Sequence, residues 1–151
     1  MNIEIKTEGI EDWGKDKEKT LLNFFTRVGV EGQQLIYADA KSMEASGNLA
    51  RSVTYLPKNT QVIIKATANY ATYALETGTP PGTNVSTRAI AQWLKQKRIS
   101  GNAFLIARKI NKEGSKTYRR GGRGGVTKVF NQLKDVIVPN YISQIQEAYA
   151  D

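Results

Sequence analysis

Hydrophobic residues recur at helical spacing over a long stretch near the start of the chain. Between residues 12 and 45 they form one stripe, made up of Leu21, Phe25, Val28, Leu35, Ile36 and Met43. This spacing predicts a long helix with one buried face. Gly29 and Gly32 weaken it by about 1 kcal/mol each relative to alanine, and indicate either a break or close packing. Gly47 then ends the helix, as a C-terminal glycine does.

An alternating pattern of apolar and polar residues follows. Residues 49–55 and 61–67 alternate, and a turn-forming segment with Pro57 separates them. They predict an antiparallel hairpin, and residues 3–6 predict a further short strand. Because a lone hairpin is marginally stable, we expect it to pack on the long helix or to pair with the N-terminal strand.

Helical spacing returns in the second half of the chain. Ser86 or Thr87 is expected to cap a helix through about Arg98, and Ser100 to cap a second helix that ends at Gly114. We expect these two helices to form a hairpin with basic outer faces. A C-terminal helix follows from residue 126, and Pro139 should break or kink it because proline lacks an amide donor.

The order of these elements predicts an α+β fold, with a small antiparallel β-sheet packed on the long N-terminal helix, an added helical hairpin and a C-terminal helix. We expect residues 1–151 to form a single domain. Its core would comprise about residues 1–80 and 126–151, and the basic hairpin with the loop after it would be an insertion at about 86–125.

Charge is distributed unevenly along the chain. The net charge is +8, but residues 1–50 hold six basic and nine acidic side chains, and residues 51–151 hold sixteen basic and five acidic ones. The basic peak lies between Arg88 and Lys134, where thirteen basic residues accompany one acid, Glu113. This asymmetry indicates a surface that faces an anionic partner, whereas scattered basic residues alone would also fit solvated helix faces.

Composition excludes much common enzyme chemistry. The chain has no Cys and no His, which removes disulfides, thiolate nucleophiles, Ser-His-Asp triads and imidazole metal ligands. The acids between Glu4 and Glu18 match no metal-binding loop and predict a solvated N-terminus. Glu76 and Glu113 lack a partner acid for paired-carboxylate catalysis. We therefore expect no enzyme activity, no cofactor and no catalytic, cofactor-binding or metal-binding residue.

Targeting signals are also missing from the pattern. Acidic residues begin at Glu4 and no apolar segment follows, so the first residues do not form a signal peptide. No apolar run reaches the roughly 20 residues that a membrane-spanning helix needs. We therefore expect no membrane partner and a chain that folds in the cytosol where it is made.

The Arg/Gly tract from Arg119 to Gly125 has two interpretations. It is either a solvated, flexible hinge between helices, or a loop in which Arg119, Arg120 and Arg123 face DNA or a neighbouring subunit while glycine allows close approach to phosphate. We favour the hinge as the resting state. DNA contact would add to it without sequence readout, because no reading helix is evident.

The segment Tyr70-x-x-Tyr73-x-x-Glu76-x-Gly78-Thr79 also has two interpretations. It is either an aromatic core plug followed by a loop, or a structural junction. In the junction, the Glu76 carboxylate would accept hydrogen bonds from the amides of Gly78 and Thr79, and the tyrosines would pack underneath.

This segment resembles a signature of tailed-bacteriophage head–tail connection and tail-completion proteins, a tail-terminator-like family. Three further pieces follow the family pattern in order between about residues 38 and 114. They are Ala40-Lys41 with Gly47-x-Leu49-x-x-Ser52-Val53, then Ile90-x-x-Trp93-x-x-x-Lys97, then Ala103-Phe104-x-Ile106-Ala107-Arg108-x-Ile110-x-x-x-Gly114. The chain departs from the family after Gly114, where Thr117-Tyr118-Arg119-Arg120 replaces a Pro-Phe-containing segment.

The resemblance implies a non-enzymatic virion protein. Such proteins form rings, commonly of six subunits, in the neck or at the head-proximal end of the tail. There they contact neighbouring neck, connector and tail-tube proteins and surround the DNA path without reading its sequence. Tyr70, Tyr73, Glu76, Gly78 and Thr79 would then maintain the fold and the subunit interface.

Two rival functions remain at this point. A small basic module that binds nucleic acid without sequence preference would use the positively charged C-terminal half. An enzyme that uses carboxylates alone is disfavoured because no paired site is found. We expect the first to bind DNA tightly as a monomer, and a ring subunit to bind DNA weakly and to form defined oligomers.

Overall fold

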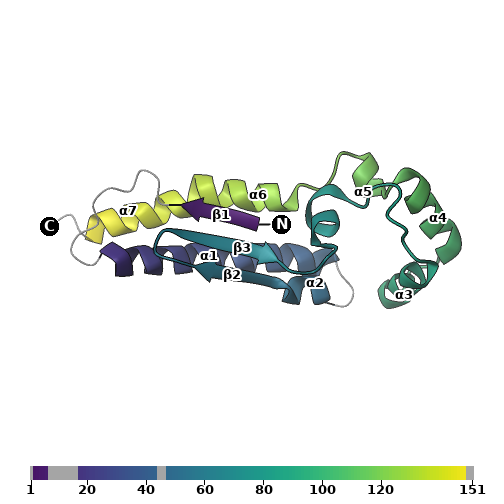
Figure 1. Cartoon of the computed structure of the whole chain (residues 1–151), viewed down its shortest axis with the longest axis horizontal. Coiled ribbons are helices and arrows are strands. Elements are labelled where there is room, and N and C mark those ends of the chain that lie inside the picture. The colour runs from purple at the N-terminus through teal and green to yellow at the C-terminus, as the bar shows by residue number, and fades with distance from the viewer. Residues whose placement is uncertain (1, 7–16, 44–46, 149–151) are drawn as a thin grey trace.

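A three-stranded antiparallel sheet and two long helical segments form the larger part of the molecule (Figure 1). The structure is a computed structural model that describes residues 2–6, 17–43 and 47–148. The sheet is one layer and the helices are the other, and a helical hairpin extends from one end. The predicted α+β class is confirmed.

The sheet is built from β1 (Asn2–Lys6), β2 (Val53–Pro57) and β3 (Gln61–Ala66), in the order β1-β3-β2. Ile64 of the central strand lies opposite Ile3 on one side and Tyr55 on the other. Val62 and Ile64 are buried, at 0% and 1% exposed. Both expectations for the hairpin are therefore met, since it pairs with the N-terminal strand and packs on the long helix.

That long helix, α1 (Lys17–Met43), continues through Gly29 and Gly32. A Cβ atom on Gly29 would lie 2.6 Å from Cδ2 of Tyr55, and one on Gly32 would overlap Cδ1 of Ile64. Close packing, and not a break, therefore explains the two glycines, because they let the helix approach the sheet. The predicted ends of this helix, at residues 12 and 45, lie outside the described residues.

The prediction of a strand from residue 49 is wrong, because Asn48–Arg51 is a helical turn, α2. Gly47 precedes it in the left-handed conformation, with φ 76°. The amide of Arg51 donates to the Gly47 carbonyl over 3.0 Å. Leu49 and its neighbour Ala50 are both buried, whereas adjacent side chains of a strand point to opposite faces.

The C-terminal helix runs without interruption through α6 (Gly125–Gln132), the π-helical turn η2 (Leu133–Ile137) and α7 (Val138–Ala148). The expected break at Pro139 is therefore wrong. In the wider turn before it, the amide of Val138 donates to the carbonyl of Leu133, five residues back. A π-helical turn loosens the winding where proline removes a donor and its ring needs space, so the helix continues.

Polar contacts join this C-terminal helix to α1. The Tyr141 hydroxyl donates to Oε1 of Glu31 over 3.1 Å, and the Arg27 guanidinium lies 4.1 Å from the centre of the Tyr141 ring. Arg27 also donates to the side-chain oxygen of Gln144 over 3.2 Å. Two segments more than 100 residues apart in the sequence are thereby held side by side.

The predicted hairpin consists of α3 (Thr87–Lys97) and α4 (Ala103–Glu113) at one end of the molecule (Figure 1). Ser86 caps α3 as predicted, and its hydroxyl accepts from the amide of Ala89 over 3.1 Å. Asn102, and not Ser100, caps α4. The turn that begins at Arg98, which is left-handed with φ 55°, takes up Ser100, so the next helix starts later.

Candidate functional site

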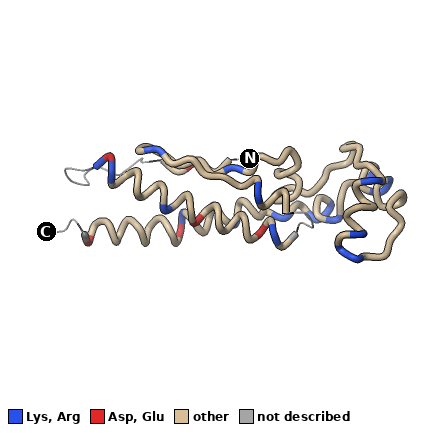
Figure 2. The backbone as a smooth tube through the Cα atoms, turned by 90° about the horizontal axis from the view of Figure 1, so that it is seen from below, with Lys and Arg blue, Asp and Glu red and all other residues tan. Residues whose placement is uncertain are grey.

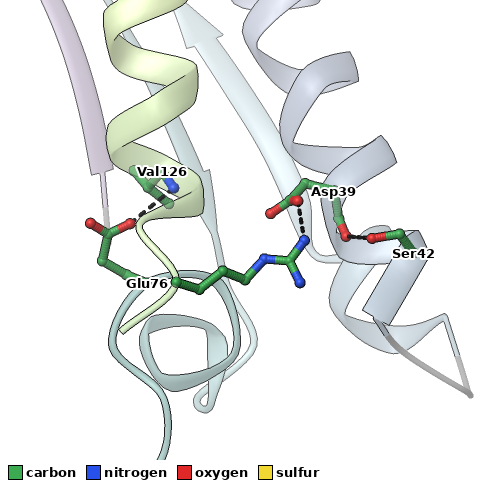
Figure 3. A network of polar contacts seen from close by, with 5 residues as sticks. Asp39, Ser42, Glu76 and Val126 are labelled. Carbon is green, nitrogen blue, oxygen red and sulfur yellow. Dashed lines mark hydrogen bonds and ion pairs between the residues drawn. The ribbon is translucent and has the colours of Figure 1, made fainter. Parts of the chain in front are cut away.

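The predicted junction centres on Glu76, which lies in the π-helical turn η1 (Tyr73–Thr77) (Figure 3). Its Oε2 accepts the amide of Val126 over 2.9 Å and that of Thr127 over 3.3 Å. Its Oε1 accepts the Thr127 hydroxyl. Glu76 therefore supplies acceptors to the first turn of α6, where amides lack helical partners and a negative charge is favourable.

The backbone of Glu76 holds the Arg/Gly tract as well. Its carbonyl accepts the amides of Arg123 and Gly124, over 2.6 Å and 3.1 Å. A Cβ atom on Gly122 would lie 2.8 Å from the same carbonyl oxygen. One residue thus fixes both the tract and the start of the helix after it.

The expected hydrogen bonds from Gly78 and Thr79 to Glu76 are absent. The amide of Gly78 donates instead to the carbonyl of Tyr73 over 2.8 Å, which completes the π-helical turn. The amide of Thr79 donates to Oγ of Ser115 over 3.0 Å, and the amide of Ser115 donates to the carbonyl of Thr79 over 2.8 Å. The Glu76 carboxylate instead has partners about 50 residues away, at Val126 and Thr127.

The two tyrosines of the signature do not pack underneath the junction. Tyr70 is 39% exposed and Tyr73 is 38% exposed, whereas Ala71 and Leu75 are 2% and 1% exposed. The small and aliphatic residues at i and i+4 form the buried face. The spacing of Ala71 and Leu75 indicates this buried face in the sequence. The tyrosines were predicted to be buried instead because they are larger.

The Arg/Gly tract is a hydrogen-bonded turn and not a loose hinge. The short helix α5 (Lys116–Arg119) precedes it. The amides of Gly121 and Gly122 then donate to the carbonyls of Tyr118 and Thr117, each over 3.0 Å. Gly122 lies close to the Glu76 carbonyl oxygen. Its lack of a side chain therefore allows close approach to the protein's own backbone.

The three arginines of the tract have different surroundings. Arg123 forms an ion pair with Asp39 on α1, so its charge is neutralised within the chain. Arg119 lies 3.6 Å from Glu113 on the surface, and Arg120 is exposed. Arg119 and Arg120 are therefore the more exposed arginines of the tract, and Arg119 is paired at the surface.

Asp39 and Ser115 also belong to this junction, and neither was predicted from the sequence. Oδ1 of Asp39 accepts from Arg123, and the Ser42 hydroxyl donates to the Asp39 carbonyl over 2.7 Å (Figure 3). Oδ2 of Asp39 is buried and has no hydrogen-bond partner among the described residues. Ser115 had a local signal, since it caps α5 through the amide of Tyr118 over 3.2 Å, whereas Asp39 had none.

The two segments that lead into the hairpin are bonded to each other. Asn111 of α4 accepts the amide of Val85 over 2.6 Å and donates to its carbonyl over 2.9 Å. The carbonyl of Asn111 also accepts the amide of Gly82 over 2.8 Å. Together with the Thr79–Ser115 pair, these contacts fix the base of the hairpin at the Glu76 junction.

Figure 2 shows Lys and Arg positions along the hairpin. The hairpin also exposes large apolar side chains. Trp93, Ile99, Phe104 and Leu105 are 41%, 47%, 58% and 57% exposed. Arg108 and Lys112 follow Phe104 on α4 and are exposed as well. An exposed apolar surface with a basic rim is typical of a contact site for another macromolecule.

Neither a metal site nor a membrane span is found where the structure describes the chain. No group of three or more acidic side chains is placed to hold a metal ion there. Most of the acids between Glu4 and Glu18 lie outside those residues. No described helix is both long and apolar enough to cross a bilayer.

Comparisons with protein-family models, with curated proteins and with solved structures find no match. The geometry and the residues above are therefore the whole basis for the functional proposal.

Proposed function

We propose that the chain is a structural subunit of a tailed-phage neck or tail end, which assembles into a ring that joins the head and portal assembly to the tail. The ring would surround the DNA path, and six subunits is the expected number. The protein would act in the virion after synthesis in the bacterial host, with neck, connector and tail-tube proteins as neighbours. No step in this role requires catalysis.

One observation carries this proposal: the signature residues hold the basic hairpin in a fixed position on the α+β body. Glu76 caps α6 and binds the Arg/Gly tract, and Thr79 pairs with Ser115 where the chain leaves the hairpin. A ring subunit must present such an extension to its neighbour at a constant angle. The sheet on a long helix is also the fold that the resemblance implies.

The charge distribution fits a DNA conduit with limited contact. A channel that is too positive would hold DNA through counterion release. Pairing of Arg123 with Asp39 and proximity of Arg119 to Glu113 reduce the free positive charge at the tract. The remaining basic residues of the hairpin are then available for contact with acidic surfaces of neighbouring subunits.

Electron microscopy of the purified protein, alone and with tail tubes, tests the proposal. We expect rings of defined size, or a monomer that assembles only at the end of a tube. A Glu76→Ala phage should give headless tails and tailless heads, because the hairpin would lose its fixed position. Normal virion yield from this mutant would count against the proposal.

A non-specific nucleic-acid-binding module is the alternative, and the exposed aromatic side chains among the basic residues of the hairpin favour it. Trp93 and Phe104 would offer stacking surfaces beside phosphate-binding cations. DNA titration of the monomer over a salt series separates the two functions. Tight binding with a steep salt dependence supports the module, whereas weak binding together with defined oligomers supports the ring.

A further inference from the structure

An open hollow lies beside α4, on the exposed side of the hairpin. It has a volume of about 440 Å³, and its lining includes Val85, Phe104, Ala107, Arg108 and Lys112. Phe104 is 58% exposed, and Ala107 forms a buried apolar floor at 3% exposed. The volume lies within the usual range of binding pockets, roughly 300–1,000 Å³.

Two cations stand at the rim of this hollow. Arg108 and Lys112 are four residues apart on α4, so they share one face of the helix with Phe104. Neither forms an ion pair with any residue in the ranges that the structure describes. Such a site suits a segment that carries carboxylates beside a large apolar side chain. The carboxylates would form ion pairs with Arg108 and Lys112, and the apolar side chain would pack against Phe104 and Ala107.

The chain itself contains a segment of this chemistry. Residues 7–16, Thr-Glu-Gly-Ile-Glu-Asp-Trp-Gly-Lys-Asp, hold four acids against one lysine, together with Ile10 and Trp13. They connect β1 to α1 and lie outside the described residues. Both their charge and their apolar side chains complement the hollow.

This segment cannot reach the hollow of its own chain. The end of β1 and the start of α1 both lie on the side of the molecule away from α4 (Figure 1). A ten-residue connection that leaves and returns extends no more than about 20 Å. The 27 residues of α1 alone span about 40 Å, and α4 lies beyond the far end of that helix.

We propose that the hollow beside α4 binds residues 7–16 of a second copy of this chain, with Trp13 against the apolar floor and the acids of the segment against Arg108 and Lys112. The described residues that flank the donor segment, Lys6 and Lys17, lie on the side of the molecule away from α4, so the proposed contact is head-to-tail. Repeated, such a contact closes a ring or extends a filament. Its role in a virion rests on the proposed function, but the contact itself does not.

Peptide binding tests the contact directly. A fluorescently labelled peptide of residues 7–16 is titrated with the full chain at physiological salt, and its anisotropy is followed. Arg108→Glu should weaken binding by at least about tenfold, since a favourable charge pair becomes repulsive. Lys109→Glu is the matched control, because it makes the same charge change on the same helix outside the lining of the hollow.

Lys109→Glu should change the peptide affinity by no more than about twofold, because salt screens distant exposed charges. A peptide with Trp13→Ala should lose binding although its charge is unchanged. Equal weakening by the two helix variants, or no binding of the peptide to the unaltered chain, would overturn the contact.

Charge exchange in the full chain tests its role in assembly. The mass of the protein, in solution or, if the free chain is monomeric, assembled on tail tubes, is measured for Glu11→Lys/Asp12→Lys, for Arg108→Glu/Lys112→Glu, and for the chain with all four changes. Each pair alone should lower the mass, and the four together should restore it. Circular dichroism verifies that each variant folds.

The outcomes separate this contact from the proposed function. Oligomers that persist in both paired variants would overturn the contact and leave the ring proposal standing. Peptide binding by a chain that stays monomeric, even with tail tubes, would support the contact and contradict the ring.

Discussion

At the scale of single residues, Glu76 has the most consequences. Its carboxylate and its carbonyl hold two different parts of the chain, and both partners lie about 50 residues further along the sequence. A lost helix cap costs roughly 0.5–2 kcal/mol, and a charged acceptor lies at the upper end of that range.

We therefore expect Glu76→Ala to lower the free energy of unfolding by about 2 kcal/mol in urea. Glu113→Ala is the control, since the Glu113 carboxylate forms an exposed ion pair with Arg119 and such pairs contribute about 0–1 kcal/mol. Equal losses in the two variants would show that the Glu76 contacts do not stabilise the fold.

Gly78 allows a second test at this scale, because its positive φ favours glycine and its neighbour is close. Its φ is 75°, and a Cβ atom would overlap the amide nitrogen of Tyr118. Gly82 has a similar φ of 80° with no atom within 4 Å of such a Cβ. Both positions have a positive φ, which disfavours a side chain, but only Gly78 has the steric contact.

Gly78→Ala should therefore lower the melting temperature more than Gly82→Ala, by several degrees in a chain of this size. The difference reports on the contact between the signature and α5. Identical melting temperatures would mean that Tyr118 can move away from the new side chain without loss of stability.

At the scale of elements, the sequence predicted what depends on local periodicity. Spacing and turn residues predicted both helices of the hairpin, the Ser86 cap and the β2–β3 pairing. They left open whether α1 continues through Gly29 and Gly32, which close packing against the sheet decides. The two π-helical turns do not, because a bond from residue i to i+5 leaves no separate spacing in the sequence. The partners of Glu76 and Asp39 could not be predicted either, because they depend on tertiary contacts that leave no local pattern in the sequence.

The contact between α1 and α7 makes a prediction about alkaline pH. Burial raises the pKa of Tyr141 above its ordinary value of 10.0, and the hydrogen bond to Glu31 adds to the effect. The folded state thus holds the phenolic proton more tightly than the unfolded state. This contribution to stability is complete below pH 10 and is lost as the pH rises through the pKa of the folded protein.

Tyr141→Phe should therefore remove part of the fall in unfolding free energy above pH 10. Lysine titration affects both proteins alike, so the difference between their profiles isolates Tyr141. Tyr37→Phe is the matched control, since it removes the same hydroxyl group from an exposed position on α1. A Tyr141→Phe profile parallel to that of the unaltered chain would contradict the assignment.

At the scale of the whole molecule, the hairpin has a small core of its own. Leu94 and Ala107 are its buried apolar residues, and neither belongs to the main hydrophobic cluster. Gly82 and Asn111 are directly bonded at its base, so a short linker can join them.

Replacement of residues 83–110 by a short Gly-Ser linker should leave a folded body. We expect the circular dichroism of a folded α+β protein and a melting temperature within roughly 5 °C of the original, because the main core is untouched. The shortened chain should fail to self-associate if the hollow beside α4 is the contact. An unfolded product would show that the hairpin is needed for the body to fold.

The bonded base of the hairpin also has a mechanical consequence. A load applied at the tip of α3 and α4 passes through the Asn111–Val85 and Thr79–Ser115 bonds, and then through Glu76 into α6. Because these bonds lie in series between the tip and the body, we expect them to share such a load and to pass it on to α6.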